Sequence, residues 1–203
     1  FTNPYVKAFS AWTNKHIILY HLALSLAVCF ILEWLSRHSF VSAYYFLDEH
    51  TGPFIFNSYV IFVMYSLVFL TQRRTFLRTC VPGFFAILGI ANCIILLNRV
   101  SPFGFTDLNM ITDLLTMQNT SYFTFNQALL SLLAFVLFII LLVALFKKAP
   151  KIKYKLSMTV RLVAVILLFV SVPITTHVCV ETGVMTSYFG NLAQGYLDYG
   201  YIY

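Results

Sequence analysis

Charged side chains are scarce in this sequence, where Asp, Glu, Lys and Arg together make up only 10% of the 203 residues. Apolar residues make up 60%, far above the usual composition of a soluble domain. The composition therefore excludes a soluble domain and predicts one membrane domain. The 4 cysteines show no C-x-x-C spacing, so neither a metal site nor a disulfide framework is indicated.

Catalytic signatures are also missing. The sequence has no G-x-S-x-G, no H-E-x-x-H and no glycine-rich phosphate loop, so no active site can be recognised in it. The net charge of +6 does not indicate nucleic acid, because the basic residues lie in short segments beside apolar runs. Anionic phospholipid is the nearer partner there, at about 1 kcal/mol per cation.

Apolar residues form five long stretches, each about 18 to 20 residues in length. At about 1.5 Å per helical residue, such a stretch spans roughly 27 to 30 Å, the thickness of the hydrocarbon core. The sequence therefore predicts an all-α polytopic membrane protein with five transmembrane helices. The stretches are residues 17–34, 54–71, 80–97, 127–146 and 158–177.

Charge alternates between the segments that join these stretches. The segments before the first, between the second and third, and between the fourth and fifth, together with Arg161 at the start of the fifth stretch, hold eleven of the 13 Lys and Arg. The positive-inside rule puts these segments inside, the amino terminus inside and the carboxyl terminus outside. Every acidic residue lies in the other segments or, for Glu33, at the end of the first stretch that adjoins one of them. They are Glu33, Asp48, Glu49, Asp107, Asp113, Glu181 and Asp198.

Four further segments are expected at the two membrane surfaces. Residues 1–15 carry Trp12 and other aromatic residues among lysines and suit an element at the inner interface. Residues 36–53 read as an outer loop. Residues 98–126 are predicted to contain an amphipathic helix on the outer interface, capped by Thr106. We divide the chain into a five-helix domain, residues 1–178, and an outer-interface aromatic tail, residues 179–203.

Arg37 and Arg99 are the only cations predicted on the outer side. A guanidinium at headgroup depth can bind a lipid phosphodiester through two hydrogen bonds, and Asp107 is placed to orient that of Arg99. Alternatively, Arg99 pairs with Asp107 or Glu33 and only holds a loop on the bundle. Asn92 lies inside an apolar stretch, so we expect it to face a neighbouring helix and to form an interhelical hydrogen bond.

Two further polar sites are interpreted as structural or solvated rather than functional. His21, one turn into the first stretch, is expected to be buried or to snorkel rather than to relay protons. Asp48, Glu49 and His50 are expected in a solvated loop, because adjacent residues point apart and make a poor cation site.

Two strings of residues resemble the membrane portion of the lipoteichoic acid synthase family. The first runs from Asn92 through Arg99 and Pro102 to Asp107 and Leu108. The second combines Y-F-G-N-L-A at 188–193 with Tyr196, Tyr199, Gly200 and Tyr201. Five helices, with the amino terminus inside, also match that family. Arg99, Asp107 and Asn92 stand at the positions of its arginine, aspartate and asparagine. Together with Arg37, they are the candidate lipid-binding residues.

The resemblance implies a phosphoglycerol transferase in the cell membrane of a Gram-positive bacterium. Such an enzyme takes glycerol phosphate from phosphatidylglycerol, through a covalent threonine intermediate, and adds it to a growing polymer. The threonine and a manganese or magnesium ion belong to an extracellular domain that these residues do not include. We accordingly expect a piece of a longer protein. Its expected partners are phosphatidylglycerol, its own catalytic domain, and either cell-envelope proteins or a second copy of the chain.

Two other functions fit the same composition. The first is a membrane module that binds lipid or acts as a scaffold without any enzyme. The second is a small transporter, which is disfavoured because charged residues are nearly absent from the apolar stretches.

Overall fold

The computed structural model of the chain describes residues 4–98, 100–104, 125–149, 151–188 and 190–203. Helices dominate this part of the chain, and no strand occurs among the residues it covers. Their order is α1 (Pro4–Lys15), α2 (Ile17–Arg37), α3 (Phe40–Glu49), α4 (Thr51–Tyr65), the 3₁₀ helix η1 (Ser66–Leu70), α5 (Arg74–Asn98), α8 (Phe125–Lys148), α9 (Met158–Glu181) and α10 (Leu192–Tyr199).

Within the described ranges, four helical segments are long and apolar enough to cross a membrane. They are Ile17–Arg37, Thr51–Leu70, Arg74–Leu97 and Met158–Glu181. Helix α8 occupies the remaining apolar stretch, and its crossing of the membrane stays a prediction. The chain is thus an α-helical membrane protein.

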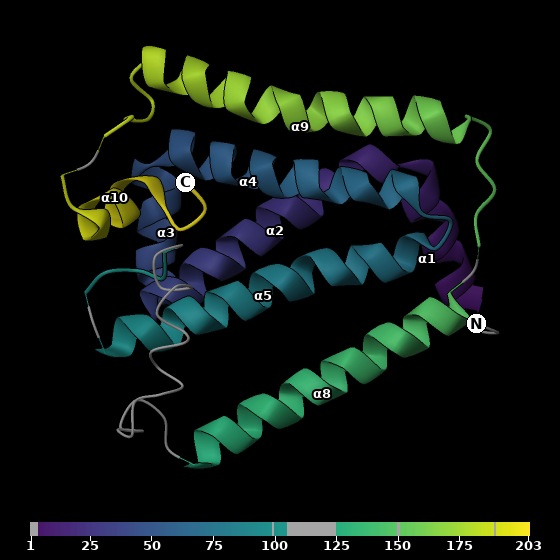
Figure 1. Cartoon of the computed structure of the whole chain (residues 1–203), viewed down its shortest axis with the longest axis horizontal. Coiled ribbons are helices and arrows are strands. Elements are labelled where there is room, and N and C mark those ends of the chain that lie inside the picture. The colour runs from purple at the N-terminus through teal and green to yellow at the C-terminus, as the bar shows by residue number, and fades with distance from the viewer. Residues whose placement is uncertain (1–3, 99, 105–124, 150, 189) are drawn as a thin grey trace.

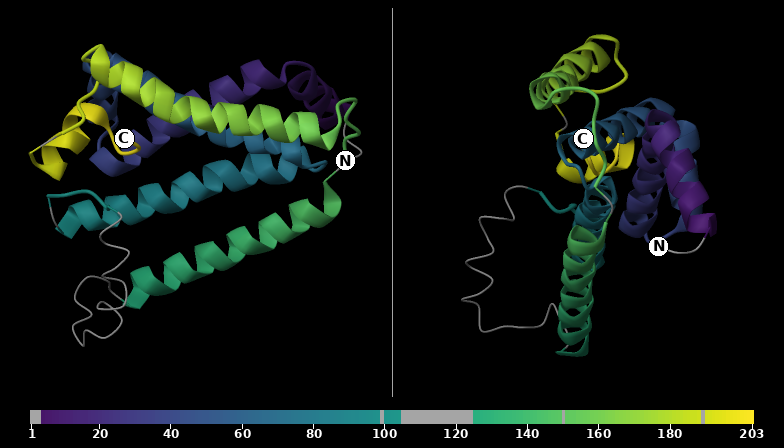
Figure 2. Two further views of the ribbon diagram at one scale, coloured as in Figure 1. Left: turned by 45° about the horizontal axis from the view of Figure 1, so that its top comes forward. Right: turned by 90° about the vertical axis from the view of Figure 1, so that its right-hand side faces the viewer.

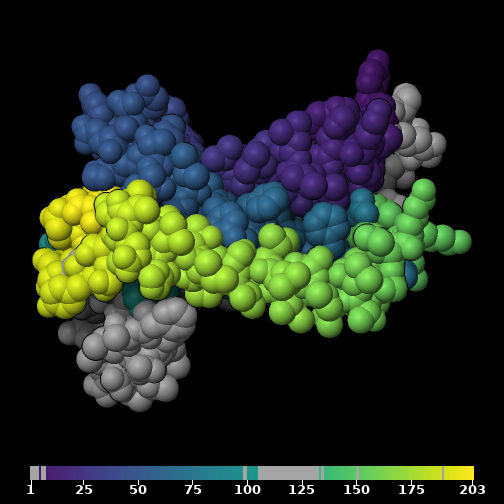
Figure 3. Space-filling view, turned by 90° about the horizontal axis from the view of Figure 1, so that it is seen from above, coloured from purple at the N-terminus to yellow at the C-terminus, as the bar shows by residue number. Residues whose placement is uncertain are grey.

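The helices pack around α2, which contacts both α4 and α5 (Figure 1). Helix α9 lies against α4 and η1, whereas α8 lies against α5 on the other side of the bundle (Figure 2). Seen from above, α9 runs along most of the molecule (Figure 3). Most of its apolar side chains are exposed and Val165 is buried. An apolar helix with so little cover within the protein is suited to face lipid.

Two glycines in α5 bring neighbouring helices close. A Cβ on Gly89 would lie 2.7 Å from Leu32 of α2, and one on Gly83 would lie 1.9 Å from the ring of Phe138 in α8. Both contacts require glycine, because any side chain at these positions would overlap the neighbouring helix. Small residues generally allow close helix approach in membranes.

The described charges separate along the bundle. We call the end of the bundle where α1 lies and where α5 and α9 begin the basic end, because these segments carry Lys15, Arg74 and Arg161 (Figure 1). The opposite end, where α3 and α10 lie, is the acidic end; α2 reaches it with Glu33, and α10 carries Asp198. Every acidic residue that the structure describes lies at the acidic end, which agrees with the charge pattern of the sequence.

The structure corrects one predicted segment and leaves another open. Residues 36–53 are not a loop, because Ser39 caps a separate short helix, α3, by accepting a hydrogen bond from the backbone N–H of Ser42 at 3.3 Å. Asp48 and Glu49 form the end of that helix, and His50 joins it to α4. The predicted amphipathic helix that starts near Thr106 lies outside the described residues.

Candidate functional site

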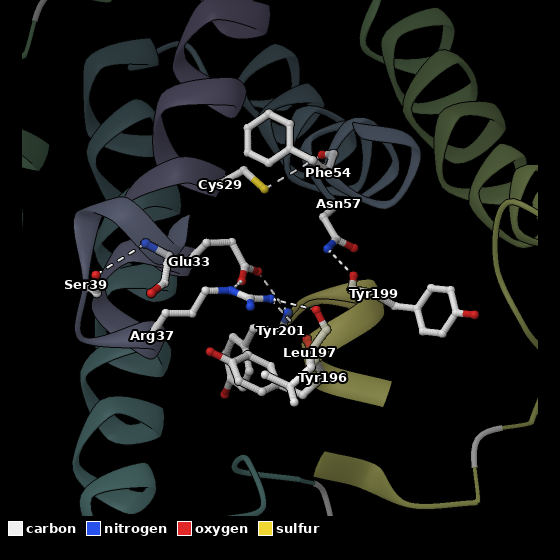
Figure 4. Close-up of polar contacts among 11 residues, drawn as sticks. Cys29, Glu33, Arg37, Ser39, Phe54, Asn57, Tyr196, Leu197, Tyr199 and Tyr201 are labelled. Atoms are coloured by element: carbon white, nitrogen blue, oxygen red, sulfur yellow. Dashed lines mark hydrogen bonds and ion pairs between the residues drawn. The ribbon is translucent and has the colours of Figure 1, made fainter. Parts of the chain in front are cut away.

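Three polar side chains at the acidic end, of which Glu33 and Asn57 are buried, bind the C-terminal segment. Glu33 and Arg37 stand one turn apart in the last part of α2, and Asn57 lies in α4. All three direct their polar atoms at α10 and the residues after it (Figure 4). We call Glu33, Arg37 and Asn57 the tail-binding cluster. Glu33 is 1% exposed and Asn57 is fully buried.

Arg37 joins α2 to the end of α10. Its Nε donates to Oε2 of Glu33 at 3.0 Å, and this is the one ion pair among the residues that the structure describes. One terminal nitrogen of Arg37 also donates to the carbonyl oxygens of Tyr196 at 3.3 Å and Leu197 at 3.1 Å. The last carbonyls of a helix lack partners within it and attract cations. Arg37 therefore caps α10 from a different helix.

Glu33 and Asn57 hold the backbone that follows. Oε1 of Glu33 accepts from the backbone N–H of Tyr201 at 2.9 Å, and Nδ2 of Asn57 donates to the carbonyl oxygen of Tyr199 at 2.8 Å. Gly200 stands between them with φ +84°, and a Cβ there would lie 2.6 Å from Asn57 Nδ2 and 2.7 Å from Glu33 Oε1. Glycine is needed at this position for its conformation and for the space.

Aromatic rings enclose the Arg37 guanidinium. It lies 4.3 Å from the ring centroid of Phe46 and 5.1 Å from that of Tyr196. Burial raises the pKa of the Tyr196 hydroxyl, and the nearby Glu33 raises it further. Tyr196 therefore stays neutral, and its ring supplies a cation–π contact without adding a charge to the cluster.

The predicted lipid-binding residues have separate positions in the structure. The guanidinium of Arg37 is directed at the protein, and a lipid role for it stays a prediction. Asn92 is fully buried, as expected for a polar group within an apolar stretch. Its Oδ1 accepts from the backbone N–H of Phe103 at 2.8 Å. The prediction of an interhelical hydrogen bond is therefore wrong. Asn92 instead binds the backbone of the segment that follows its own helix, α5. Arg99 and Asp107 lie outside the described residues.

Burial of His21 is confirmed at the basic end. Its side chain is 1% exposed and stacks on the ring of Tyr65. Nε2 of His21 accepts a hydrogen bond from Nε of Arg78 at 3.1 Å, and the two terminal nitrogens of Arg78 reach Thr13. His21 thus helps to attach α1 and α5 to α2.

Neither the role of Asn57 nor that of the Glu33–Arg37 spacing is predicted from the sequence. A signal was present in each case. An asparagine inside an apolar stretch needs a partner within the protein, and a glutamate four residues before an arginine forms a pair on one helix face. Neither signal reveals that the partner is a backbone segment more than 140 residues away.

An open cleft of about 410 Å³ adjoins the tail-binding cluster. Its lining includes two carboxylates, those of Glu49 and Asp198, which disfavour a phosphate group. Within the described part of the chain, no group of three or more His, Cys, Asp or Glu side chains could hold a metal ion. The manganese or magnesium implied by the resemblance concerns a domain that these residues do not include.

Comparison of the chain with models of protein families, with curated proteins and with solved structures gives no match. The fold and the site define only a class of protein. The chain is an α-helical membrane protein whose C-terminal segment is bound by polar side chains at one end of the bundle.

Proposed function

We propose that this chain is the membrane domain of a phosphoglycerol transferase of the lipoteichoic acid synthase type. It anchors the enzyme in the cell membrane of a Gram-positive bacterium and presents phosphatidylglycerol to a catalytic domain that follows residue 203. That domain supplies the threonine nucleophile and the manganese or magnesium ion.

The observation that carries this proposal is the binding of residues 196–201 to the bundle. These residues belong to the string that resembles the family, and Glu33, Arg37 and Asn57 bind their backbone. The other string also meets the acidic end, where Asn92 binds Phe103. A segment fixed in this way supports a function in which the next domain has a defined position above the membrane. A free linker would give no such control.

The proposal includes the orientation of the bundle. The acidic end faces the outside, the basic end faces the cytoplasm, and α8 is the fifth span. Anionic lipids of the cytoplasmic leaflet attract positive charge, so the basic end is favoured at that surface. The tail-binding cluster then lies on the side where the family assembles its polymer.

Arg99 is the proposed ligand of the lipid phosphate, and Asp107 is proposed to orient its guanidinium. A bidentate, charge-assisted contact of this kind contributes roughly 1.5 to 3 kcal/mol, which is about a tenfold to hundredfold change in affinity. Arg99→Lys should weaken phosphatidylglycerol binding nearly as much as Arg99→Ala. Lysine keeps the charge, but the planar geometry that makes two hydrogen bonds is lost. Unchanged lipid affinity in both variants and in Asp107→Asn would refute this assignment.

The activity is tested with the full-length protein that the gene encodes. Membranes that contain it are incubated with phosphatidylglycerol labelled in its acyl chains, and labelled diacylglycerol is measured with and without a divalent-metal chelator. We expect metal-dependent release of diacylglycerol and loss of polyglycerolphosphate in a deletion strain. Absence of both would refute the transferase and favour a lipid-binding or scaffolding module without an enzyme.

A further inference from the structure

The link between α8 and α9 crosses the basic end of the bundle in an extended form (Figure 1). We call residues 151–155 the lysine strap; its sequence is Lys-Ile-Lys-Tyr-Lys. In an extended chain, alternate side chains point to opposite sides. The strap follows this rule, since Lys151, Lys153 and Lys155 are exposed whereas Ile152 and Tyr154 are partly buried.

The inward positions of the strap are anchored to the bundle. The backbone N–H of Ile152 donates to the carbonyl oxygen of Gln72 at 2.8 Å. The Tyr154 hydroxyl lies 3.0 Å from the carbonyl oxygen of Val68 and 2.9 Å from that of Thr71. These carbonyls lie at the end of the α4–η1 segment. Tyr154 thus caps that helix and fixes the strap in the same contact.

Two arginines complete the anchor. The guanidinium groups of Arg74 and Arg161 lie 4.6 Å and 4.0 Å from the Tyr154 ring centroid. Nε of Arg74 also donates to the Tyr154 hydroxyl at 3.0 Å, and Arg161 donates to the carbonyl oxygen of Phe69 at 2.6 Å. The strap is therefore a built element of the fold.

Arginines and lysines have different roles at this end. Each arginine that the structure describes here lies over an aromatic ring, including Arg73 over Phe146 and Arg78 over Tyr20. The three strap lysines form no ion pair with any described residue. Arginine is suited to stacking and to fixed hydrogen bonds, and lysine is a mobile, hydrated charge.

We propose that the lysine strap is a binding surface for the headgroups of anionic phospholipid in the leaflet at the basic end. Three lysines on one side of an anchored, extended backbone are spaced by roughly 6.6 to 6.8 Å. Exposed apolar side chains flank them, with Phe146 before the strap and Leu156 and Met158 after it. These apolar neighbours place the lysines at headgroup depth. This inference concerns the opposite end from the proposed catalytic domain and does not rest on the transferase activity.

The test measures binding of phosphatidylglycerol and of phosphatidylcholine to the purified chain in detergent by native mass spectrometry. The variant Lys151→Gln/Lys153→Gln/Lys155→Gln should bind phosphatidylglycerol about 100-fold more weakly, from about 1 kcal/mol per cation, with phosphatidylcholine unaffected. The control variant Lys15→Gln/Lys147→Gln/Lys148→Gln loses the same charge at the same end. Its affinity for phosphatidylglycerol should fall by less than about tenfold, a tenth of the loss expected for the strap variant. An equal loss in the control would overturn the proposal, because net charge alone would then explain the binding.

A second variant tests whether the strap must be fixed. Tyr154→Ala keeps every lysine but removes the anchor, and we expect about tenfold weaker binding of phosphatidylglycerol. Tyr154→Phe, which removes only the hydroxyl, replaces it if the alanine variant does not fold, and a smaller loss is expected. Full affinity in the folded variant would overturn the proposal. Soluble glycerol phosphate should not compete at the same concentration, and effective competition would mean that the lysines bind free phosphate.

Discussion

Replacement of Glu33 by alanine should release the C-terminal segment from the bundle. Glu33 is 1% exposed, and its two oxygens bind Arg37 and the backbone N–H of Tyr201. Its removal leaves the Arg37 charge, whose side chain is only 10% exposed, without a counter-ion. Breaking a buried pair in this way costs roughly 3 to 5 kcal/mol. The carbonyls of Tyr196 and Leu197 still accept from Arg37, so we take the lower limit, about 3 kcal/mol.

Hydrogen exchange measures this loss where it occurs. The amide of Tyr201 exchanges only when its bond to Glu33 opens, so a cost of about 3 kcal/mol predicts exchange on the order of 100-fold faster. The amides in the middle of α4 serve as an internal reference and should change little. The double variant Glu33→Gln/Arg37→Met should be milder than Glu33→Ala, because it removes both charges. Unchanged exchange at Tyr201 in Glu33→Ala would refute this account of the tail-binding cluster.

Three other outcomes follow from the glycines and the charge pattern. Gly200→Ala should destabilise the bound tail by at least about 1 to 2 kcal/mol, from its positive φ alone, whereas Gly190→Ala, where a Cβ meets nothing within 4 Å, should be neutral; equal melting temperatures would contradict this. Gly83→Ala should cost roughly 1 to 3 kcal/mol by pushing away the α8 ring beside it, and thermal unfolding in detergent checks it. In a cysteine-free background, an impermeant thiol reagent added to whole cells should label Ser42→Cys and spare Lys153→Cys, and the reverse pattern would invert the proposed orientation.

The sequence predicted the apolar helices well because their signal is local. A stretch of about 18 apolar residues has few alternatives to a membrane-length helix. The helix boundaries were less accurate. Helix α5 begins at Arg74 rather than at residue 80, since Arg74 and Arg78 make hydrogen bonds within the protein and can extend the helix beyond its apolar part. Helix α3 was missed because ten residues are too few for a membrane-length pattern.

The tail-binding cluster could not have been predicted as a unit. The positions of Glu33 and Asn57 indicate that each needs a partner, but hydropathy carries no information on which segment supplies it. The partners here are backbone atoms of Tyr199 and Tyr201, and backbone atoms leave no side-chain signature in the sequence. Gly200 is the one residue whose type is required by the contact, because it has a positive φ. That angle cannot be read from the sequence.

The separation of Glu33 and Tyr201 by 168 residues sets an order of assembly. At about 5 to 20 residues per second, synthesis of the intervening chain takes roughly 8 to 34 s. During that time α2 has already been made, and the Glu33 oxygen that will accept from Tyr201 does not yet have that partner. The contact between the end of α2 and the residues that follow α10 is therefore among the last in the bundle that can form. A chain whose synthesis stops before residue 201 cannot make it.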